Sequence, residues 1–166
     1  LQLEKASLAA FTAEFTSATP PNEIIAQSSS FEGLITSKSL DFVQANLQDY
    51  DSVRKLFSQY KIDAVMHFAG LKAVAESVDN PLLYYTNNLS STFILCRVMS
   101  EFKVKIMVFS SSATVYGDAD VIPIPENSPI KKAFSPYGKT KQICEEIIRD
   151  IAYICRNRKY CRCYRA

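Results

Sequence analysis

The chain has 166 residues, of which 48% are apolar and 22% charged, with 19 basic and 17 acidic side chains. These proportions are typical of a globular protein of one domain, and they exclude a disordered or collagen-like chain. Glycine is scarce, because the chain has only Gly33, Gly70, Gly117 and Gly138 where average usage of ~7% would give about a dozen. No two of them lie closer than 21 residues, so the sequence contains no G-x-G-x-x-G or G-x-x-x-x-G-K turn to hold a phosphate.

The net charge of +2 is unevenly distributed. Residues 156–166 hold five basic side chains and no acid, which leaves −3 on the rest of the chain. The body of the chain therefore lacks the basic surface that binds nucleic acid, and no apolar run approaches the ~20 residues of a membrane span. Five cysteines, an odd number, favour the cytoplasm over a secreted disulfide scaffold. Residue 1 is Leu and no signal peptide opens the chain, so we expect a cytoplasmic fragment.

The first part of the chain has little regular patterning. In the divergent segment 1–39, Leu8, Phe11 and Phe15 keep helical spacing, and the following Pro- and Ser-rich stretches indicate loops. Leu40–Ala45 is predicted to be a short strand. A helix is predicted from about Asp51, because Val53, Leu56, Phe57 and Tyr60 lie on one helical face.

From residue 64 onward the elements alternate regularly. Ala64–Phe68 and Lys105–Phe109 are short apolar runs, typical of strands buried on both faces. Asp79-Asn80-Pro81 predicts the start of a long helix that ends at about Glu101. Ser135-Pro136 predicts the cap of a last helix. The predicted apolar stripe of that helix is Ile143, Ile147, Ile151 and Ile154.

This alternation predicts an α/β fold with a parallel sheet and crossover helices over residues 40–155, followed by a basic, Cys-containing tail at 156–166. In such sheets ligands bind beyond the carboxyl ends of the strands. The segments after Ala45, Phe68 and Phe109 are therefore the ones in which functional residues are expected.

Three motifs lie at those places. Tyr137 and Lys141 are four residues apart at the start of the last helix and share one face. A tyrosine acts as a base near neutrality only if its pKa of ~10 falls by about three units, and a neighbouring ammonium favours the phenolate. Ser110–Gly117 begins at a strand end, where a serine hydroxyl can bind a substrate hydroxyl, and Phe68–Lys72 follows another strand. Each motif alone is also compatible with an ordinary turn or a solvated Tyr–Lys pair; their coincidence at one sheet edge favours a site.

Residues from about Leu40 to Ala152 resemble UDP-glucose 4-epimerases, a family of the extended short-chain dehydrogenase/reductase superfamily. The residues that carry the resemblance are His67–Val74, Glu76–Val78, Tyr84-Tyr85, Asn87-Asn88, Phe109–Gly117 and Ser135–Lys141. Related dehydratases carry acidic residues after the strand-end hydroxyl, where this chain has Ala113 and Thr114. The resemblance thus implies interconversion of UDP-galactose and UDP-glucose through a 4-keto sugar and bound NAD, by a cytoplasmic homodimer.

The resemblance also implies roles for individual residues. Tyr137 would be the catalytic base, Ser112 would bind the sugar 4-oxygen, and Lys141 would bind the nicotinamide ribose and favour the phenolate. Thr114 would lie near the sugar, and Lys72 would contact both the substrate and the cofactor. The remaining cofactor-binding residues implied are Asn46, Leu47, Phe68, Ala69, Gly70 and Asn87. Asn46 stands where the family usually has an aspartate, and its amide oxygen keeps a weaker contact with adenine.

The sequence departs from the family at both ends. The family's first strand, G-x-x-G-x-x-G turn and helix have no counterpart in residues 1–39, so we expect a gap in the sheet beside the Ala64–Phe68 strand. Residues 156–166 replace the R-Y-F-N-P segment that leads to the substrate domain, and a solvated tail is expected there. The fold predicted is a partial NAD-binding Rossmann fold.

Two hypotheses remain open, an epimerase fragment and a non-catalytic remnant that acts as an interaction module. No metal is expected, because Cys155, Cys161 and Cys163 have neither a histidine partner nor a C-x-x-C spacing, although a zinc site in the tail is an alternative. Binding of RNA or anionic lipid by the tail is a second alternative. His67, the only histidine, is predicted to pack within its strand.

Overall fold

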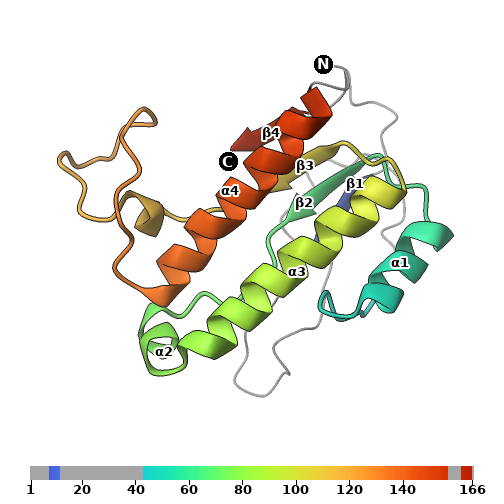
Figure 1. Cartoon of the computed structure of the whole chain (residues 1–166), viewed down its shortest axis with the longest axis horizontal. Helices are drawn as coiled ribbons and strands as arrows, with labels where there is room; N and C mark the ends of the chain where they lie inside the picture. Colours follow the sequence, from blue (N-terminus) through green and yellow to red (C-terminus); the bar gives the residue numbers. More distant parts are fainter. Residues whose placement is uncertain (1–7, 12–42, 157–161, 166) are drawn as a thin grey trace, which may run out of the picture.

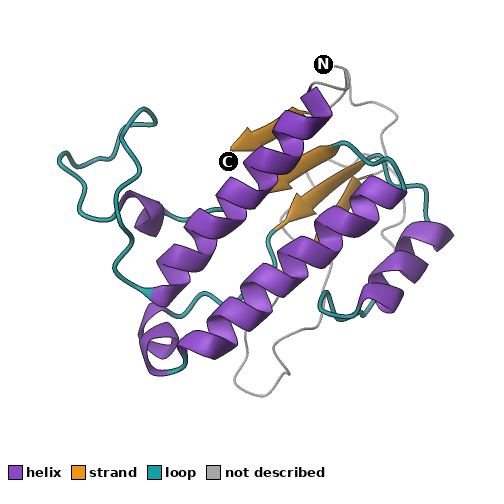
Figure 2. Ribbon diagram, viewed as in Figure 1, coloured by secondary structure: helices purple, strands orange, loops and turns teal. Residues whose placement is uncertain are grey.

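The computed structural model describes residues 8–11, 43–156 and 162–165. Four parallel strands form one sheet in the order β1 (Leu8–Phe11), β2 (Ala64–His67), β3 (Ile106–Phe109) and β4 (Arg162–Arg165). The long helices α3 (Pro81–Glu101) and α4 (Pro136–Arg156) cross in front of the strands in Figures 1 and 2. The predicted α/β class with a parallel sheet is confirmed.

The other elements flank this layer. Helix α1 (Tyr50–Gln59) packs against α3, while the short α2 (Val74–Asp79) contacts both long helices (Figure 1). A single 3-10 turn, η1 (Ala113–Tyr116), follows β3 and contacts α4. The predicted helices from about Asp51, from Pro81 and from Pro136 are confirmed, as are the strands before Gly70 and Ser110.

The hydrophobic core lies between the sheet and the helices. Apart from Leu47, which precedes α1, its buried members come from α1, β2, α3, β3 and α4, and they include Phe57, Val65, Leu95, Met107 and Ile148. Burying such side chains stabilises the fold by about 1.5–3 kcal/mol each. The core thereby fixes the position of the strand ends relative to α4.

The sheet has no gap beside β2. Leu8–Phe11, where we expected helical spacing, forms a strand that pairs in parallel with β2, with Leu8 opposite Ala64. Both the helical interpretation and the predicted gap are wrong. A four-residue apolar run fits either structure, and the unpaired edge of β2 decides in favour of a strand because its backbone groups need partners. Phe15 lies outside the described residues.

Two further strand predictions need correction. Within Leu40–Ala45, residues 43–45 form no strand, and only Asn46 makes an isolated bridge, while 40–42 lie outside the described residues. In the basic tail, where we expected a solvated end and predicted no strand, Arg162–Arg165 forms strand β4, parallel to β3. Residues 157–161 and 166 lie outside the described part of the chain.

The buried stripe of α4 is shifted by one residue from the prediction. Cys144, Ile148 and Ala152 are buried, whereas Ile143, Ile147 and Ile151 are only half-buried. The reason is that the buried face of α4 also contains the polar Thr140 and Lys141, which a search for apolar periodicity passes over.

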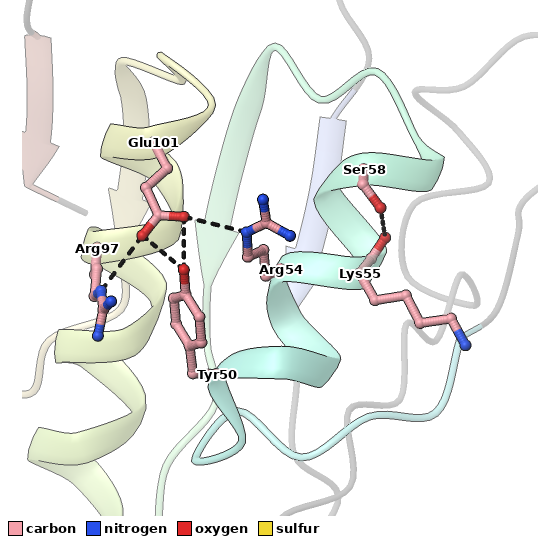
Figure 3. A network of polar contacts seen from close by, with 6 residues as sticks. All are labelled: Tyr50, Arg54, Lys55, Ser58, Arg97 and Glu101. Atoms are coloured by element: carbon pink, nitrogen blue, oxygen red, sulfur yellow. Dashed lines mark hydrogen bonds and ion pairs between the residues drawn. The ribbon is translucent and has the colours of Figure 1, made fainter.

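A polar network on the surface joins α1 to α3 (Figure 3). The Tyr50 hydroxyl donates to both carboxylate oxygens of Glu101, at 2.9 and 2.8 Å, and this hydrogen bond raises the pKa of Tyr50. Arg54 and Arg97 approach the same carboxylate through Nε at 3.5 and 3.3 Å. Because these charges are exposed and screened, they add orientation more than stability.

Within the described residues, no helix has the length and apolarity needed to cross a membrane.

Candidate active site

The site lies where β2 and β3 end side by side. Phe68-Ala69-Gly70 follows β2, and Ser110-Ser111-Ser112 follows β3. The Ser110 amide donates to the carbonyl of His67 at 3.0 Å, so the two segments leave the sheet together. The carboxyl edge of the sheet therefore brings together two of the three motifs found in the sequence.

Helix α4 brings the third motif to this edge. The Ser135 hydroxyl caps the helix by accepting from the Gly138 amide at 3.1 Å, as the Ser-Pro pair predicts. Tyr137 and Lys141 lie one turn apart and are 8% and 6% exposed. A buried tyrosine and a buried lysine on one face of a helix are poorly explained as a solvated surface pair.

Lys141 is held by the end of β3. Its Nζ donates to the carbonyl of Ser110 at 2.8 Å and lies 4.8 Å from the centre of the Phe109 ring and 6.0 Å from that of Tyr137. Burial lowers the pKa of this ammonium. An ammonium at this position favours negative charge on nearby atoms.

Ser112 and Thr114 approach the same helix end. The Thr114 hydroxyl donates to Ser112 Oγ at 2.9 Å, and the Thr114 amide lies 3.3 Å from the same oxygen. A Cβ built on Gly138 would lie 3.2 Å from Thr114 Oγ1 and 2.9 Å from the Ala133 Cβ, so η1 and α4 meet closely there. The hydroxyl of Ser112 is thus oriented by Thr114, and Thr114 itself lies against Gly138, the residue after Tyr137.

The aromatic ring of Tyr137 packs in a small apolar cluster with Leu71 and Tyr84. The rings of Tyr84 and Tyr137 meet edge to face, with centres 6.5 Å apart. The Tyr84 hydroxyl donates to Glu76 Oε2 at 2.6 Å, and burial together with this bond raises the pKa of Tyr84. Tyr84 is therefore a packing residue, held protonated beside the candidate base.

Asn88 on α3 connects the segment after β2 to α4. Its Oδ1 accepts from the Leu71 amide at 2.8 Å, and its Nδ2 donates to the Leu71 carbonyl and to Thr140 Oγ1, both at 3.1 Å. Gly70 needs its positive φ of +148°, and a Cβ there would lie 3.1 Å from Asn88 Oδ1. In the sequence the Asn87-Asn88 pair is the only signal for this residue, and the resemblance implied a role for Asn87 rather than for Asn88.

His67 is buried inside the sheet, as predicted. It is 1% exposed, its Nε2 lies 3.1 Å from Thr92 Oγ1, and its ring packs on Phe109 with centres 5.5 Å apart. Burial, assisted by the charge of Lys141, lowers the pKa of His67 to about 3. The imidazole is therefore neutral at physiological pH.

The remaining predicted residues lie at different depths. Phe68, Ala69 and Gly70 are half-buried, Lys72 is exposed, and Asn87 is buried on α3. Asn46 is exposed, with its Oδ1 accepting from the Gln48 amide at 2.8 Å, whereas Leu47 is 4% exposed and belongs to the core.

The described residues contain no group of three or more metal-ligating side chains. Of the tail cysteines, Cys161 lies outside the described residues, and the proposed tail zinc site cannot be placed.

The fold and the buried Tyr-x-x-x-Lys pair define a partial Rossmann-type domain of the short-chain dehydrogenase/reductase kind. The sequence model of the GDP-mannose 4,6 dehydratase family matches residues 19–157, and the chain belongs to this family.

Individual relatives are more specific than the family model. The chain is 54% identical over 117 residues to a UDP-glucose 4-epimerase of Bacillus subtilis, covering 70% of this chain and 34% of the relative. It is also 54% identical over 112 residues to UDP-glucose 4-epimerase 2 of Arabidopsis thaliana, covering 68% and 32%. The chain therefore spans about a third of the length of these curated relatives.

Solved structures of UDP-glucose 4-epimerases are similar to this chain as well. The UDP-glucose 4-epimerase of Bifidobacterium longum, in complex with NAD+ and UDP, superimposes with a TM-score of 0.71 at 40% identity, covering 80% of this chain and 40% of that one. The enzyme of Stenotrophomonas maltophila, with bound NAD and a formylated UDP-arabinopyranose, gives 0.68 at 39% identity, covering 75% and 36%.

Proposed function

We propose that this chain carries the catalytic part of an NAD-dependent UDP-glucose 4-epimerase, which interconverts UDP-galactose and UDP-glucose in the cytoplasm as a homodimer. The observation that carries the proposal is the buried Tyr137–Lys141 pair of α4, whose lysine Nζ binds the Ser110 carbonyl at the end of β3, two residues before Ser112. The identity to two curated epimerases over about 70% of the chain supports the choice of reaction.

In this proposal Tyr137 removes the proton of the sugar 4-hydroxyl and returns it when the 4-keto sugar is reduced. Lys141, with its Nζ bonded to Ser110, stabilises the phenolate form. The Ser112 hydroxyl accepts from Thr114 and is left free to donate its own proton to the 4-oxygen of the sugar. Thr114 and Lys72 would contact the sugar and its phosphates.

The residues present fit the nicotinamide half of NAD. Phe68, Ala69 and Gly70 follow β2 at the carboxyl edge of the sheet and are half-buried, and the small Ala69 and Gly70 would let the backbone approach the nicotinamide. Lys141 would hold the nicotinamide ribose, Asn87 would bind from α3, and Asn46 and Leu47 would flank the adenine. NAD supplies the oxidation at sugar C4 and its reversal.

A dehydratase is less well supported, although the family model bears that description. Elimination of water from a 4-keto sugar needs an acid and a base beside the reacting carbons. The positions after Ser112 hold Ala113, which is exposed, and Thr114, whose hydroxyl is bonded to Ser112. Neither side chain can supply that pair.

The second hypothesis is that these 166 residues are a non-catalytic remnant that acts as an interaction module. Residues 1–39 contain a single glycine, Gly33, and therefore no Gly-rich turn to hold a pyrophosphate, which favours this hypothesis. It predicts that the catalytic segment no longer functions even when a complete cofactor and substrate site surrounds it.

The test is to transfer residues 43–156 into the matching segment of the Bacillus subtilis epimerase and to measure conversion of UDP-galactose to UDP-glucose. We expect turnover within about tenfold of the parent, and a loss of at least about 100-fold when Tyr137→Phe is added, because a general base contributes roughly 10²–10⁴ in rate. Tyr116→Phe, outside the site proposed, is the matched control. A folded, NAD-loaded chimera without turnover would contradict the epimerase and favour the remnant.

A further inference from the structure

Glu145 is a buried carboxyl group that the proposed reaction does not use. It lies on α4 one turn after Lys141 and is 8% exposed. Its Oε1 accepts from the Ser111 hydroxyl at 2.5 Å, and its Oε2 lies 3.7 Å from Nη2 of Arg149. Burying a carboxyl group costs free energy unless it is bonded, so its presence beside Ser111 calls for a reason.

Lys141 and Glu145 hold neighbouring residues of one segment. Lys141 donates to the carbonyl of Ser110, and Glu145 accepts from the side chain of Ser111, so two successive turns of α4 bind two successive residues after β3. A helix places such side chains on one face because they are four positions apart. The segment that ends in Ser112 is thereby attached to the helix that carries Tyr137.

The attachment of Ser111 also sets the direction of Ser112. The backbone at Ser112 is extended, with φ −154° and ψ 148°, and successive side chains of an extended chain point to opposite sides. With Ser111 turned toward Glu145, Ser112 faces away from Glu145 and receives the hydroxyl of Thr114.

We propose that Glu145 is a positioning residue that acts through Ser111, fixing the backbone that binds Lys141 and the direction of the Ser112 hydroxyl. The effect of this positioning on catalysis rests on the proposed epimerase function. A purely structural need would be met as well by an apolar side chain of similar size, which avoids the cost of burying a carboxyl group.

The experiment measures amide hydrogen exchange by NMR in the whole 166-residue chain and needs no substrate, so failure of the epimerase proposal does not affect it. The reporters are the amides of Ser110, Thr114 and Val115, which are bonded to His67, Ser112 Oγ and the Ser112 carbonyl. Glu145→Ala should accelerate their exchange about 10- to 100-fold, while the amides of α3 keep their rates.

Four further variants make the result specific. Ser111→Ala, which removes only one hydroxyl, should give the same acceleration, and the double variant should exchange no faster than either single one. Glu145→Gln keeps an acceptor oxygen and should restore slow exchange to within about threefold of the parent. Glu146→Ala, at the exposed neighbouring position, is the control and should change nothing.

A second readout follows the Lys141 ammonium in the ¹H–¹⁵N spectrum. Its signal should shift in Glu145→Ala and Ser111→Ala and return in Glu145→Gln, because the carbonyl of Ser110 moves with Ser111. If Glu145→Ala does not fold, Ser111→Ala decides. Unchanged exchange at the three reporters in Ser111→Ala, or equal acceleration in Glu146→Ala, would overturn the proposal.

Discussion

At the scale of single residues, the site combines groups whose charges are set by burial. His67 is held neutral and Lys141 has a lowered pKa, and both lie around Phe109, the last residue of β3. A second positive charge at His67 would oppose the ammonium of Lys141. A neutral histidine therefore adds no second positive charge beside the Lys141 ammonium.

The burial of His67 predicts a pH dependence of stability. The pKa is about 3 in the folded chain against 6.5 in the unfolded one, so below pH 6.5 protons bind preferentially to the unfolded chain. The contribution of His67 to the free energy of unfolding is therefore fully present above about pH 6.5 and is lost progressively as the pH falls toward 3. Urea unfolding at pH 7.5 and 5.0 should give free energies about 2 kcal/mol lower at pH 5.0.

His67→Gln is the control for that prediction. His67 is the only histidine, so no other imidazole contributes in this range. The variant should be less stable at pH 7.5 but should lose most of the difference between the two pH values. A variant with the full parental pH dependence would show that the histidine is not the titrating group.

The same scale shows which site residues a sequence can reveal. The positions of Tyr137, Lys141, Ser112 and Thr114 at a helix start and after a strand were predictable, because local patterns locate such places well, while the roles that the resemblance implies for these residues stay predictions. Glu145 was not, because its role depends on a bond to Ser111, 34 residues away, and an acidic residue in a helix is ordinarily a solvated one.

At the scale of elements, turn η1 depends on a glycine that closes it. Gly117 has φ +58° and ψ −128°, and its amide donates to the Thr114 carbonyl at 3.3 Å. A Cβ at this position would lie 2.6 Å from the backbone oxygen of Lys132. This backbone conformation is open to glycine and costly for other residues.

We expect Gly117→Ala to destabilise the chain by about 1–3 kcal/mol, measured by urea unfolding, because strain and contact with Lys132 act together. Asp118→Ala, at the exposed next position, should stay within about 0.5 kcal/mol of the parent. Equal stabilities of Gly117→Ala and the parent would mean that η1 tolerates a side chain at its end.

Helices and strands were predicted correctly where the length of the segment or its flanking residues distinguished a helix from a strand. The helices α1, α3 and α4 have clear starts, and β2 and β3 are apolar runs bounded by Gly70 and Ser110. The four-residue strands β1 and β4 were missed because their pairing partners, β2 and β3, are more than 50 residues away along the chain. Only the assembled sheet reveals that those edges are occupied.

At the scale of the whole molecule, the sequence contains the residues proposed for catalysis but no Gly-rich turn that would bind the cofactor's phosphates. Three of the four glycines, Gly70, Gly117 and Gly138, lie in the candidate site or its supporting turns. None belongs to a Gly-rich turn that would present backbone amides to a pyrophosphate. The strand β1 occupies its place in the sheet without such a turn in the sequence that follows it.

We therefore expect these 166 residues to purify without NAD. The two phosphates of the cofactor would lack the amides and helix dipole that normally hold them, and the contacts proposed for Asn46, Lys72 and Lys141 replace only part of that binding. The measurement is to denature the purified chain and quantify nicotinamide nucleotide in the supernatant by mass spectrometry. The Bifidobacterium longum epimerase, crystallised with NAD+, is the control after equal incubation with the cofactor and equal washing. Stoichiometric NAD from this chain would contradict the prediction and would mean that backbone amides elsewhere in the chain can hold the phosphates without a Gly-rich turn.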